Sequence, residues 1–159
     1  MRVAATLAVL SAVVLSACGF TPMYAETASG SSLRRIAVST PDDRLGYRLR
    51  EQLEDALGWD RGAAPLYRLT TTVDQDRVSL GRRIDDTATR YELTVRAAWT
   101  LTPTSGGAPL SGVETATTTY AAADQPYAAI AAQQDGEERA AADLARLIRL
   151  SLMQALAQQ

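Results

Sequence analysis

The stretch that most constrains the fold is 90–101, RYELTVRAAWTL, in which apolar and polar residues alternate along almost the whole length. Successive side chains of a β-strand point to opposite faces of the sheet. The pattern therefore predicts an antiparallel strand with one packed face and one wetter face. The packed set is Tyr91, Leu93, Val95, Ala97, Trp99 and Leu101, and the wetter set is Arg90, Glu92, Thr94, Arg96 and Thr100.

Three further segments carry strand signals. Ala64–Val73 alternates in the same way, and Leu110–Tyr120 is rich in threonine, which favours strands. The run Thr102–Pro109, TPTSGGAP, predicts a hairpin loop that joins the last two strands. A shorter strand is predicted over Leu33–Ser39, directly before the turn residues Thr40-Pro41.

A helix is predicted over Asp43–Leu57 from leucines at strict i, i+4 spacing, which place one apolar stripe on one helix face. Asp42 or Asp43 can cap its N-terminus, and Gly58 is suited to end it. The leucines of the stripe are Leu45, Leu49, Leu53 and Leu57.

A second, alanine-rich helix is predicted over Gln125–Ala157. Gly136 interrupts its pattern at a cost of about 1 kcal/mol, which leaves room for a break or kink there. Its buried stripe is Leu144, Leu147, Ile148, Leu152, Ala155 and Leu156, and the opposite side carries Arg139, Asp143 and Arg146 at ion-pair spacings.

The predicted order is strand, helix, strand, strand, strand, helix. One face of a four-stranded, mostly antiparallel sheet would take both helices. The fold class is therefore α+β, a two-layer sandwich.

The N-terminus has the layout of an export signal. Met1-Arg2 gives a positive start, and the uncharged run Val3–Leu15 is too short for a membrane-spanning helix, which needs about 20 residues. Leu-Ser-Ala-Cys, ending at Cys18, resembles the lipobox of bacterial lipoproteins. We predict a lipoprotein signal peptide over 1–17, a lipidated N-terminus and tether over 18–32, and a single α+β domain over 33–159. An ordinary cleaved signal followed by a buried free cysteine is the alternative.

The predicted modification of Cys18 is an N-acyl chain and an S-diacylglycerol. Each buried methylene contributes about 0.8 kcal/mol, so two or three chains hold firmly where one holds weakly. Gly19 follows the cysteine, and by resemblance to sorted lipoproteins this favours the outer membrane, with the domain facing the periplasm. A redox or nucleophilic role for Cys18 is disfavoured because the chain has no histidine and no second cysteine.

Composition narrows the function classes. A net charge of −2 argues against nucleic acid as a partner. All 16 basic residues are arginines, which suit bidentate contacts with carboxylate or phosphate, although a genomic codon bias gives the same composition.

Catalytic chemistry is scarce in this sequence. Without histidine and with one cysteine, the chain lacks the common nucleophile–base pairs and the His/Cys zinc sites. The acidic pairs Asp42-Asp43, Asp74 with Asp76, and Asp85-Asp86 are typical of caps and solvated loops. We predict no enzyme, no metal site and no cofactor beyond the covalent lipid. A periplasmic hydrolase built on one of these pairs is the competing hypothesis.

One arginine cluster is a candidate binding site. Arg82 and Arg83 lie in or beside an expected turn around Gly81, and Arg90 opens the best strand. Three guanidinium groups could bind the phosphates of an anionic lipid headgroup such as that of lipid A. The aspartate pair between them could instead pair with the arginines, as surface charges often do.

The run Cys18–Tyr24, CGFTPMY, resembles the mature N-terminus of the LptE family of lipopolysaccharide-assembly lipoproteins in its alphaproteobacterial form. Gly136 departs from the expected pattern, as does the lack of an asparagine after Tyr120. Further matches are Tyr67-Arg68-Leu69, Thr89-Arg90-Tyr91-Glu92-Leu93, Thr119-Tyr120, Tyr127-Ala128, Asp135, Arg139, Leu144-Ala145, Ile148 and Leu152.

The resemblance implies a lipidated sandwich of two helices and four strands that sits inside the outer-membrane barrel LptD. There it would help the barrel assemble and deliver lipopolysaccharide to the cell surface, and direct binding of lipopolysaccharide stays open. A sheet face rich in threonine, arginine and glutamate suits the polar interior of a large barrel, although water would suit it equally. The alternative function is a lipoprotein auxiliary subunit of an envelope lipid transport system.

Overall fold

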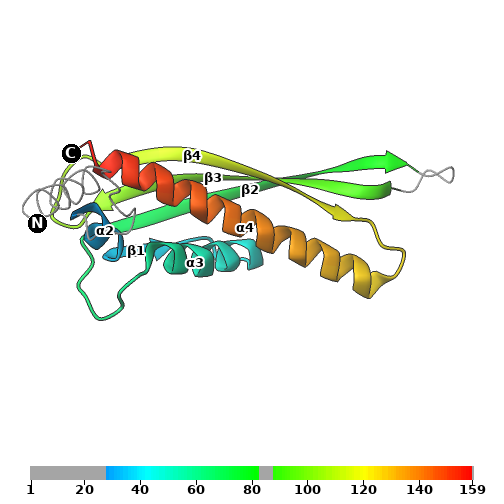
Figure 1. The fold of residues 1–159 in the computed structure, drawn as a ribbon, viewed down its shortest axis with the longest axis horizontal. Helices are drawn as coiled ribbons and strands as arrows, with labels where there is room; N and C mark the ends of the chain where they lie inside the picture. Colours follow the sequence, from blue (N-terminus) through cyan, green and yellow to red (C-terminus); the bar gives the residue numbers. More distant parts are fainter. Residues whose placement is uncertain (1–27, 83–87, 159) are drawn as a thin grey trace, which may run out of the picture.

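A four-stranded sheet forms one layer of the molecule, and helices cover one of its faces (Figure 1). The computed structural model describes residues 28–82 and 88–158. The strand order in space is β1-β2-β3-β4. The elements are α2 (Ala28–Leu33), β1 (Ile36–Ser39), α3 (Arg44–Leu57), β2 (Tyr67–Arg82), β3 (Ala88–Pro103), β4 (Leu110–Ala121) and α4 (Pro126–Leu156). The predicted two-layer α+β sandwich is confirmed.

One difference concerns the start of the described chain. Residues 28–32, which lie within the predicted tether, form α2 together with Leu33, and α2 packs near α4. The strand predicted over Leu33–Ser39 accordingly begins only at Ile36. Burial of Leu33 at the end of this short helix supplies a tertiary contact that the Gly/Ser-rich sequence does not reveal.

The sheet is mostly antiparallel, as predicted, with one parallel pair of strands. β1 runs parallel to β2, whereas β2–β3 and β3–β4 are antiparallel. β1 pairs only with Tyr67–Thr70. From Thr71 to Arg82 that edge of β2 therefore has no strand beside it within the described residues.

The predicted second strand, Ala64–Val73, is wrong at both ends. β2 begins at Tyr67 and continues to Arg82, paired with β3 throughout. Past Val73 its side chains are mostly exposed, so the apolar alternation fades while the backbone pairing continues. Gly81 accordingly lies within the strand, with φ 65°, and not in a turn.

Helix α3 follows its prediction closely. All four leucines of the predicted stripe are buried. The Asp43 carboxylate accepts a hydrogen bond from the Gly46 N–H at 2.6 Å, and Gly58 ends the helix with φ 62°. Helix α3 lies against β1 and α4.

Helix α4 runs through Gly136 without a break. A Cβ at position 136 would lie 2.9 Å from Cδ1 of Tyr120. The absence of a side chain there lets the helix approach the ring of Tyr120 on β4, and this approach explains the glycine.

The core lies between the sheet and the two long helices. The fully buried side chains of largest volume are Ile36, Leu49, Leu53, Leu69, Leu101, Leu144, Ile148, Leu152 and Val95. Trp99 belongs to the same core and lies over Gly112, where a Cβ would come within 2.4 Å of the indole. The alternation of β3 and the stripes of both helices thus meet in one cluster.

Two ends of the molecule are used below. We call the proximal end the part formed by α2, the loops 58–66 and 104–109, and the last turns of α4. The distal end is formed by the last residues of β2, the first residues of β3 and the first turns of α4 (Figure 1).

Candidate functional site

The predicted site residues fall in different parts of the chain. Cys18, Arg83 and the pair Asp85-Asp86 lie outside the described residues. Arg90 lies on β3 at the distal end, opposite Leu80 of β2 and Ala121 of β4, and it is exposed. Arg82 is at the end of β2, opposite Ala88, and its backbone is therefore beside the start of β3.

The sheet face turned away from the helices is a second candidate surface. Successive residues of a strand point to opposite faces, so Arg90, which precedes Tyr91 of the packed face, belongs to this surface. The hydroxyl oxygens of two of its threonines, Thr94 on β3 and Thr117 on β4, lie 3.4 Å apart. Its exposed members include Arg68, Thr70, Thr72, Asp74, Asp76, Arg96, Thr115, Thr117 and Thr119. The face is mostly polar, with Val78 and Val113 as exposed apolar members, and no described helix covers it (Figure 1).

An aromatic cluster with an arginine occupies the helix side of the distal end. The Arg77 guanidinium lies 4.9 Å from the centroid of the Tyr91 ring, and Tyr91 lies 5.5 Å from the buried ring of Tyr120. The Tyr120 hydroxyl, with a smaller contribution from Tyr91, raises the pKa of Arg77. Arg77 is thus a permanently charged group held over an aromatic face.

Sequence reasoning missed Arg77 because it grouped only the arginines nearest the expected turn. The alternation of the strand could have revealed it. Arg77 is two residues after Gln75 and therefore lies on the same, packed face of the sheet. Arg77 and Arg90 consequently project from opposite faces of the sheet.

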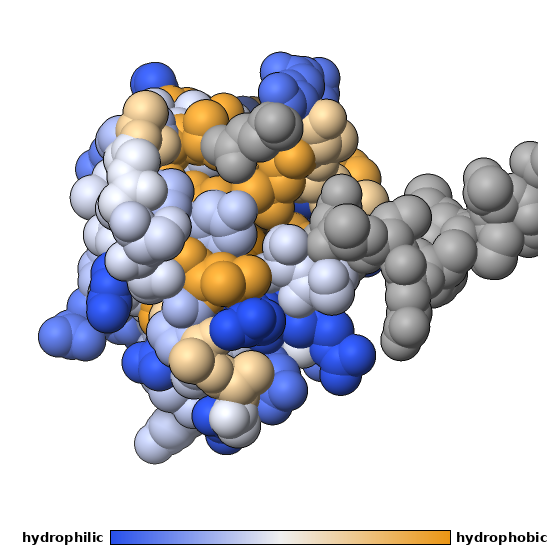
Figure 2. Space-filling view, turned by 90° about the vertical axis from the view of Figure 1, so that its left-hand side faces the viewer, coloured by the Kyte–Doolittle hydropathy of each residue, from blue (hydrophilic) through white to orange (hydrophobic). Residues whose placement is uncertain are grey.

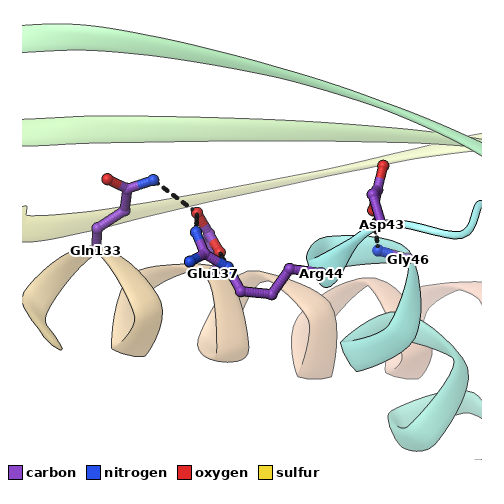
Figure 3. A network of polar contacts seen from close by, with 5 residues as sticks. All are labelled: Asp43, Arg44, Gly46, Gln133 and Glu137. Carbon is purple, nitrogen blue, oxygen red and sulfur yellow. Dashed lines mark hydrogen bonds and ion pairs between the residues drawn. The ribbon is translucent and has the colours of Figure 1, made fainter. Parts of the chain in front are cut away.

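An ion pair between a half-exposed arginine and a buried carboxylate ties α3 to α4 (Figure 3). Arg44 Nη2 donates to Glu137 Oε1 at 2.8 Å, and Arg44 Nε donates to Oε2 at 2.9 Å. Gln133 Nε2, one turn earlier on α4, donates to Oε1 at 2.8 Å. Glu137 is 3% exposed, whereas Arg44 is 52% exposed. This carboxylate has an arginine and an amide as partners and serves to position the helices.

The predicted ion pairs on the outer side of α4 are present in part. Arg146 donates to Asp143 at 3.3 Å. Arg139 pairs with Asp135 and also donates to the Thr119 carbonyl oxygen at 3.0 Å. Arg139 thus joins the distal half of α4 to β4.

An open cleft of about 900 Å³ lies beside α3. Its walls carry both signs of charge, and Glu54 in the middle accepts from Arg50 at 2.7 Å and from Arg61 at 3.0 Å. Burial by itself would raise the pKa of Glu54, but the hydrogen bonds from these two arginines outweigh it and hold the pKa below 4.5. A paired carboxylate of this kind is not poised for proton transfer.

Two kinds of site are not found in the part of the chain that the structure describes. Residues 28–82 and 88–158 hold no group of three or more His, Cys, Asp or Glu side chains that could bind a metal ion. In the same ranges no helix combines the length and the apolar character needed to cross a membrane.

Comparison with known proteins adds independent information. The model of the family described as "LptE: Lipopolysaccharide-assembly" matches residues 33–152. A crystal structure of a candidate lipoprotein from Caulobacter crescentus CB15 is 44% identical in sequence and superimposes with a TM-score of 0.71. That match covers 83% of this chain and 97% of the other. No curated protein sequence matches the chain.

Two more distant structures share the fold. A minor lipoprotein from Acinetobacter baumannii is 15% identical, with a TM-score of 0.54 over 77% of this chain and 92% of that one. An uncharacterised lipoprotein B from Nitrosomonas europaea is 16% identical, with a TM-score of 0.50 over 72% of this chain and 79% of that one.

Proposed function

This chain belongs to the LptE family of lipopolysaccharide assembly, and we propose that it is an outer-membrane lipoprotein that assembles with, and plugs, the LptD barrel. It acts without catalysis, by occupying the barrel lumen so that lipopolysaccharide can be delivered to the cell surface. Residues 1–17 are removed as a signal peptide, and the lipid on Cys18 holds the periplasm-facing domain at the membrane.

The observation that supports this proposal best is the uncovered polar face of the sheet. Helices α3 and α4 pack on one face, while the other presents threonine, arginine and acidic side chains. The lumen of a large outer-membrane barrel is polar, and a threonine-rich face offers it hydroxyl groups at regular spacing. An apolar partner would instead require an exposed apolar sheet face.

Direct contact with lipopolysaccharide belongs to the same proposal. Arg90 is exposed at the distal end, and the Arg82 backbone lies close to it in the register. Guanidinium groups bind phosphate with paired, charge-assisted hydrogen bonds. We assign Arg82, Arg83 and Arg90 to the phosphates of the lipopolysaccharide headgroup.

Co-purification from detergent-solubilised membranes tests the partner. The tagged full chain should bring down an LptD barrel in stoichiometric amount. Thr72→Arg together with Thr115→Arg, on the uncovered sheet face, should reduce the yield of barrel. Gln134→Arg together with Ala142→Arg, on exposed positions of α4, should leave it unchanged.

The outcomes of this experiment separate the competing functions. If no barrel co-purifies, the proposal is wrong. Recovery of the components of an envelope lipid transport system in its place would identify the chain as an auxiliary subunit of that system. Hydrolase activity that is lost in an Asp-pair variant that still folds would overturn the non-enzymatic role.

The lipid anchor has its own test. Cys18→Ala should give a folded chain that is unanchored or unprocessed. Fractionation of that variant with the outer membrane, in the same proportion as the wild type, would rule out the anchor.

A further inference from the structure

The edge of β2 is clear of neighbouring strands over Val73–Ser79. At the proximal end the sheet and the helices meet around hydrophobic residues, which hydrophilic ones border (Figure 2). Toward the distal end β2 extends past the end of α3 (Figure 1). Every residue from Asp74 to Ser79 is exposed, whichever face of the sheet its side chain lies on. Among the described residues, this part of β2 is paired on one side only, with β3.

The hydrogen bonds at the start of β2 show which backbone groups point to the open side. The Thr104 N–H donates to the Leu66 carbonyl oxygen at 2.9 Å, so the even-numbered residues of this segment bond to β3. The Tyr67 N–H donates to the Arg35 carbonyl oxygen at 3.3 Å, on the side of β1. Residues of a strand alternate in this way between their two neighbours. The register is unbroken as far as Leu80. The residues whose N–H and C=O groups point to the open edge are therefore Val73, Gln75, Arg77 and Ser79.

The other edge of the sheet, on β4, is partly occupied. The Ala122 N–H donates to the Thr89 carbonyl oxygen at 3.1 Å, so the odd-numbered residues of β4 face away from β3. Arg139 of α4 donates to the carbonyl oxygen of one of them, Thr119, at 3.0 Å. Between positions 73 and 79, no described side chain donates to a backbone carbonyl oxygen of β2. The β2 edge is therefore the more available of the two for an added strand.

A barrel that encloses the chain would take this edge out of bulk water, a step that rests on the function proposed above. A backbone N–H or C=O group that loses water without gaining a partner costs free energy comparable to a lost hydrogen bond. An extended segment that adds to the edge supplies partners to all of these groups at once. Strands in the wall of a closed barrel already bond to each other. The segment therefore has to come from a part of the barrel protein that lies inside the lumen or at its mouth.

The charges beside the edge define the chemistry of that segment. Asp74 and Asp76 belong to the uncovered face of the sheet, and Arg77 belongs to the helix side. Opposite charges at facing positions stabilise a pair of strands, and like charges destabilise it. A segment with basic or hydroxyl side chains on the uncovered face and an acidic side chain on the helix side fits this edge.

The same charges disfavour a second copy of the chain as the occupant. Antiparallel pairing of two β2 edges centred on Gln75 places Asp74 opposite Asp76 of the other copy. A centre at Asp76 or at Arg77 places that residue opposite itself. Each of these arrangements brings like charges together across the pair. A different chain with complementary charges avoids this repulsion.

We propose that Val73–Ser79 of β2 pairs with an extended segment of the barrel protein. The segment lies in line with β1, along the part of the edge that β1 leaves open. It bonds to the backbone of the odd-numbered residues and faces Asp74 and Asp76 with basic or hydroxyl side chains. Backbone pairing at this edge then holds the chain in the lumen together with the contacts of the uncovered sheet face.

Amide hydrogen exchange tests the pairing residue by residue. The full chain is compared alone in detergent and in the co-purified complex, with fragmentation that resolves single amides. Exchange at Gln75, Arg77 and Ser79 should slow by about tenfold or more in the complex, because these N–H groups gain an acceptor. Asp76, already bonded to β3, should change less. Thr115, whose N–H lies on the open edge of β4, should change least.

Proline at two edge positions removes the same donors. Gln75→Pro with Ser79→Pro takes away two outward N–H groups and leaves the bonds between β2 and β3 in place. Barrel binding should weaken by about tenfold through the two lost hydrogen bonds. Gln75→Ala with Ser79→Ala keeps both N–H groups and should bind as the wild type does, and so should Val113→Pro on the β4 edge. Thermal unfolding of each isolated variant checks that it folds.

Photo-crosslinking identifies the occupant. Gln75 is replaced by p-benzoylphenylalanine, and the complex is irradiated and digested for mass spectrometry. The side chain of this residue lies on the helix side, away from the uncovered face that would meet the barrel wall. The cross-linked peptide should come from a segment of the barrel protein outside its wall strands and should carry basic or hydroxyl side chains at alternate positions.

Four results would overturn the proposal. They are unchanged exchange at the odd-numbered amides, equal barrel binding by the proline and alanine pairs, a cross-link from position 75 to residues 19–27 or to a second copy, and a cross-link to a wall strand. If the wild type brings down no barrel, the proposed partner and this pairing are both wrong. A barrel that co-purifies while exchange at the odd-numbered amides stays unchanged refutes the pairing alone.

Discussion

Both carboxylate oxygens of the buried Glu137 on α4 accept hydrogen bonds from the guanidinium of Arg44, the first residue of α3, at 2.8 and 2.9 Å. The two residues are 93 positions apart in the chain. Their pairing fixes the N-terminus of one helix to the middle of the other, next to the point where Gly136 meets Tyr120. The pair therefore positions the two helices relative to each other, while the apolar core packs them on the sheet.

The pair should respond asymmetrically to substitution. Arg44→Met leaves a buried carboxylate with only Gln133 as partner and should lower the free energy of unfolding by about 3 kcal/mol. Glu137→Gln should cost less, because the half-exposed Arg44 can turn to water. Urea denaturation of both variants measures the difference. Arg146→Met, which breaks an exposed pair, is the control and should cost no more than about 0.5 kcal/mol. A larger loss for Glu137→Gln than for Arg44→Met would contradict the asymmetry.

Gly136→Ala should fail to stabilise the protein, although alanine is the better helix former by about 1 kcal/mol. The new methyl group would meet the Tyr120 ring at 2.9 Å, and that ring is itself held against Tyr91. The same substitution in a Tyr120→Leu background should recover the gain. Thermal or urea unfolding of the four proteins in this cycle provides the test. A plain gain of stability in the wild-type background would show that the ring moves freely.

The Glu54 carboxylate should make stability depend on pH. Its pKa in the folded state is lowered by Arg50 and Arg61, so its contribution is present above the unfolded-state value of about 4.5. The contribution is lost as the pH falls through the lower, folded-state pKa. Denaturation midpoints measured from neutral pH downward should fall less steeply in Glu54→Gln than in wild type. Glu51→Gln, which removes the exposed partner of Arg48, should run parallel to wild type. A pH dependence of Glu54→Gln that runs parallel to that of the wild type would refute the role of the two arginines.

Reversal of Arg82, Arg83 and Arg90 to Asp should weaken lipopolysaccharide binding by about tenfold or more, the equivalent of about 1.4 kcal/mol. The change replaces phosphate-binding groups with repelling charges. Reversal of Arg34, Arg48 and Arg146 changes the net charge equally but away from the distal end, and should have a smaller effect. Binding is measured on the purified full chain at two salt concentrations. Unchanged affinity in the first variant would remove the assignment.

The elements that were predicted well are those with a local signal. The alternation of 90–101 and the leucine stripe from Leu45 to Leu57 each require only one kind of secondary structure, and both are present with the expected faces buried. The cap at Asp43 and the stop at Gly58 follow from the same local chemistry.

The features that were missed depend on distant residues. The extension of β2 past Val73 is stabilised by backbone pairing with β3, while its own side chains have no apolar period. The sequence leaves room for a break or kink at Gly136 because the neighbour that explains the glycine, Tyr120, meets it only in the folded sheet. The ion pair of Arg44 with Glu137 carries no pattern in the sequence at all.

Among the residues that the structure describes, the short parallel pairing of β1 leaves β2 with an open edge from Thr71 to Arg82. Such an edge can template the addition of a foreign strand, and with it aggregation. Here the exposed edge carries Asp74, Asp76 and Arg77, charges that do not fit into a dry stack of strands. Within the described residues, the chain can therefore keep one long edge of β2 unpaired and still remain dispersed.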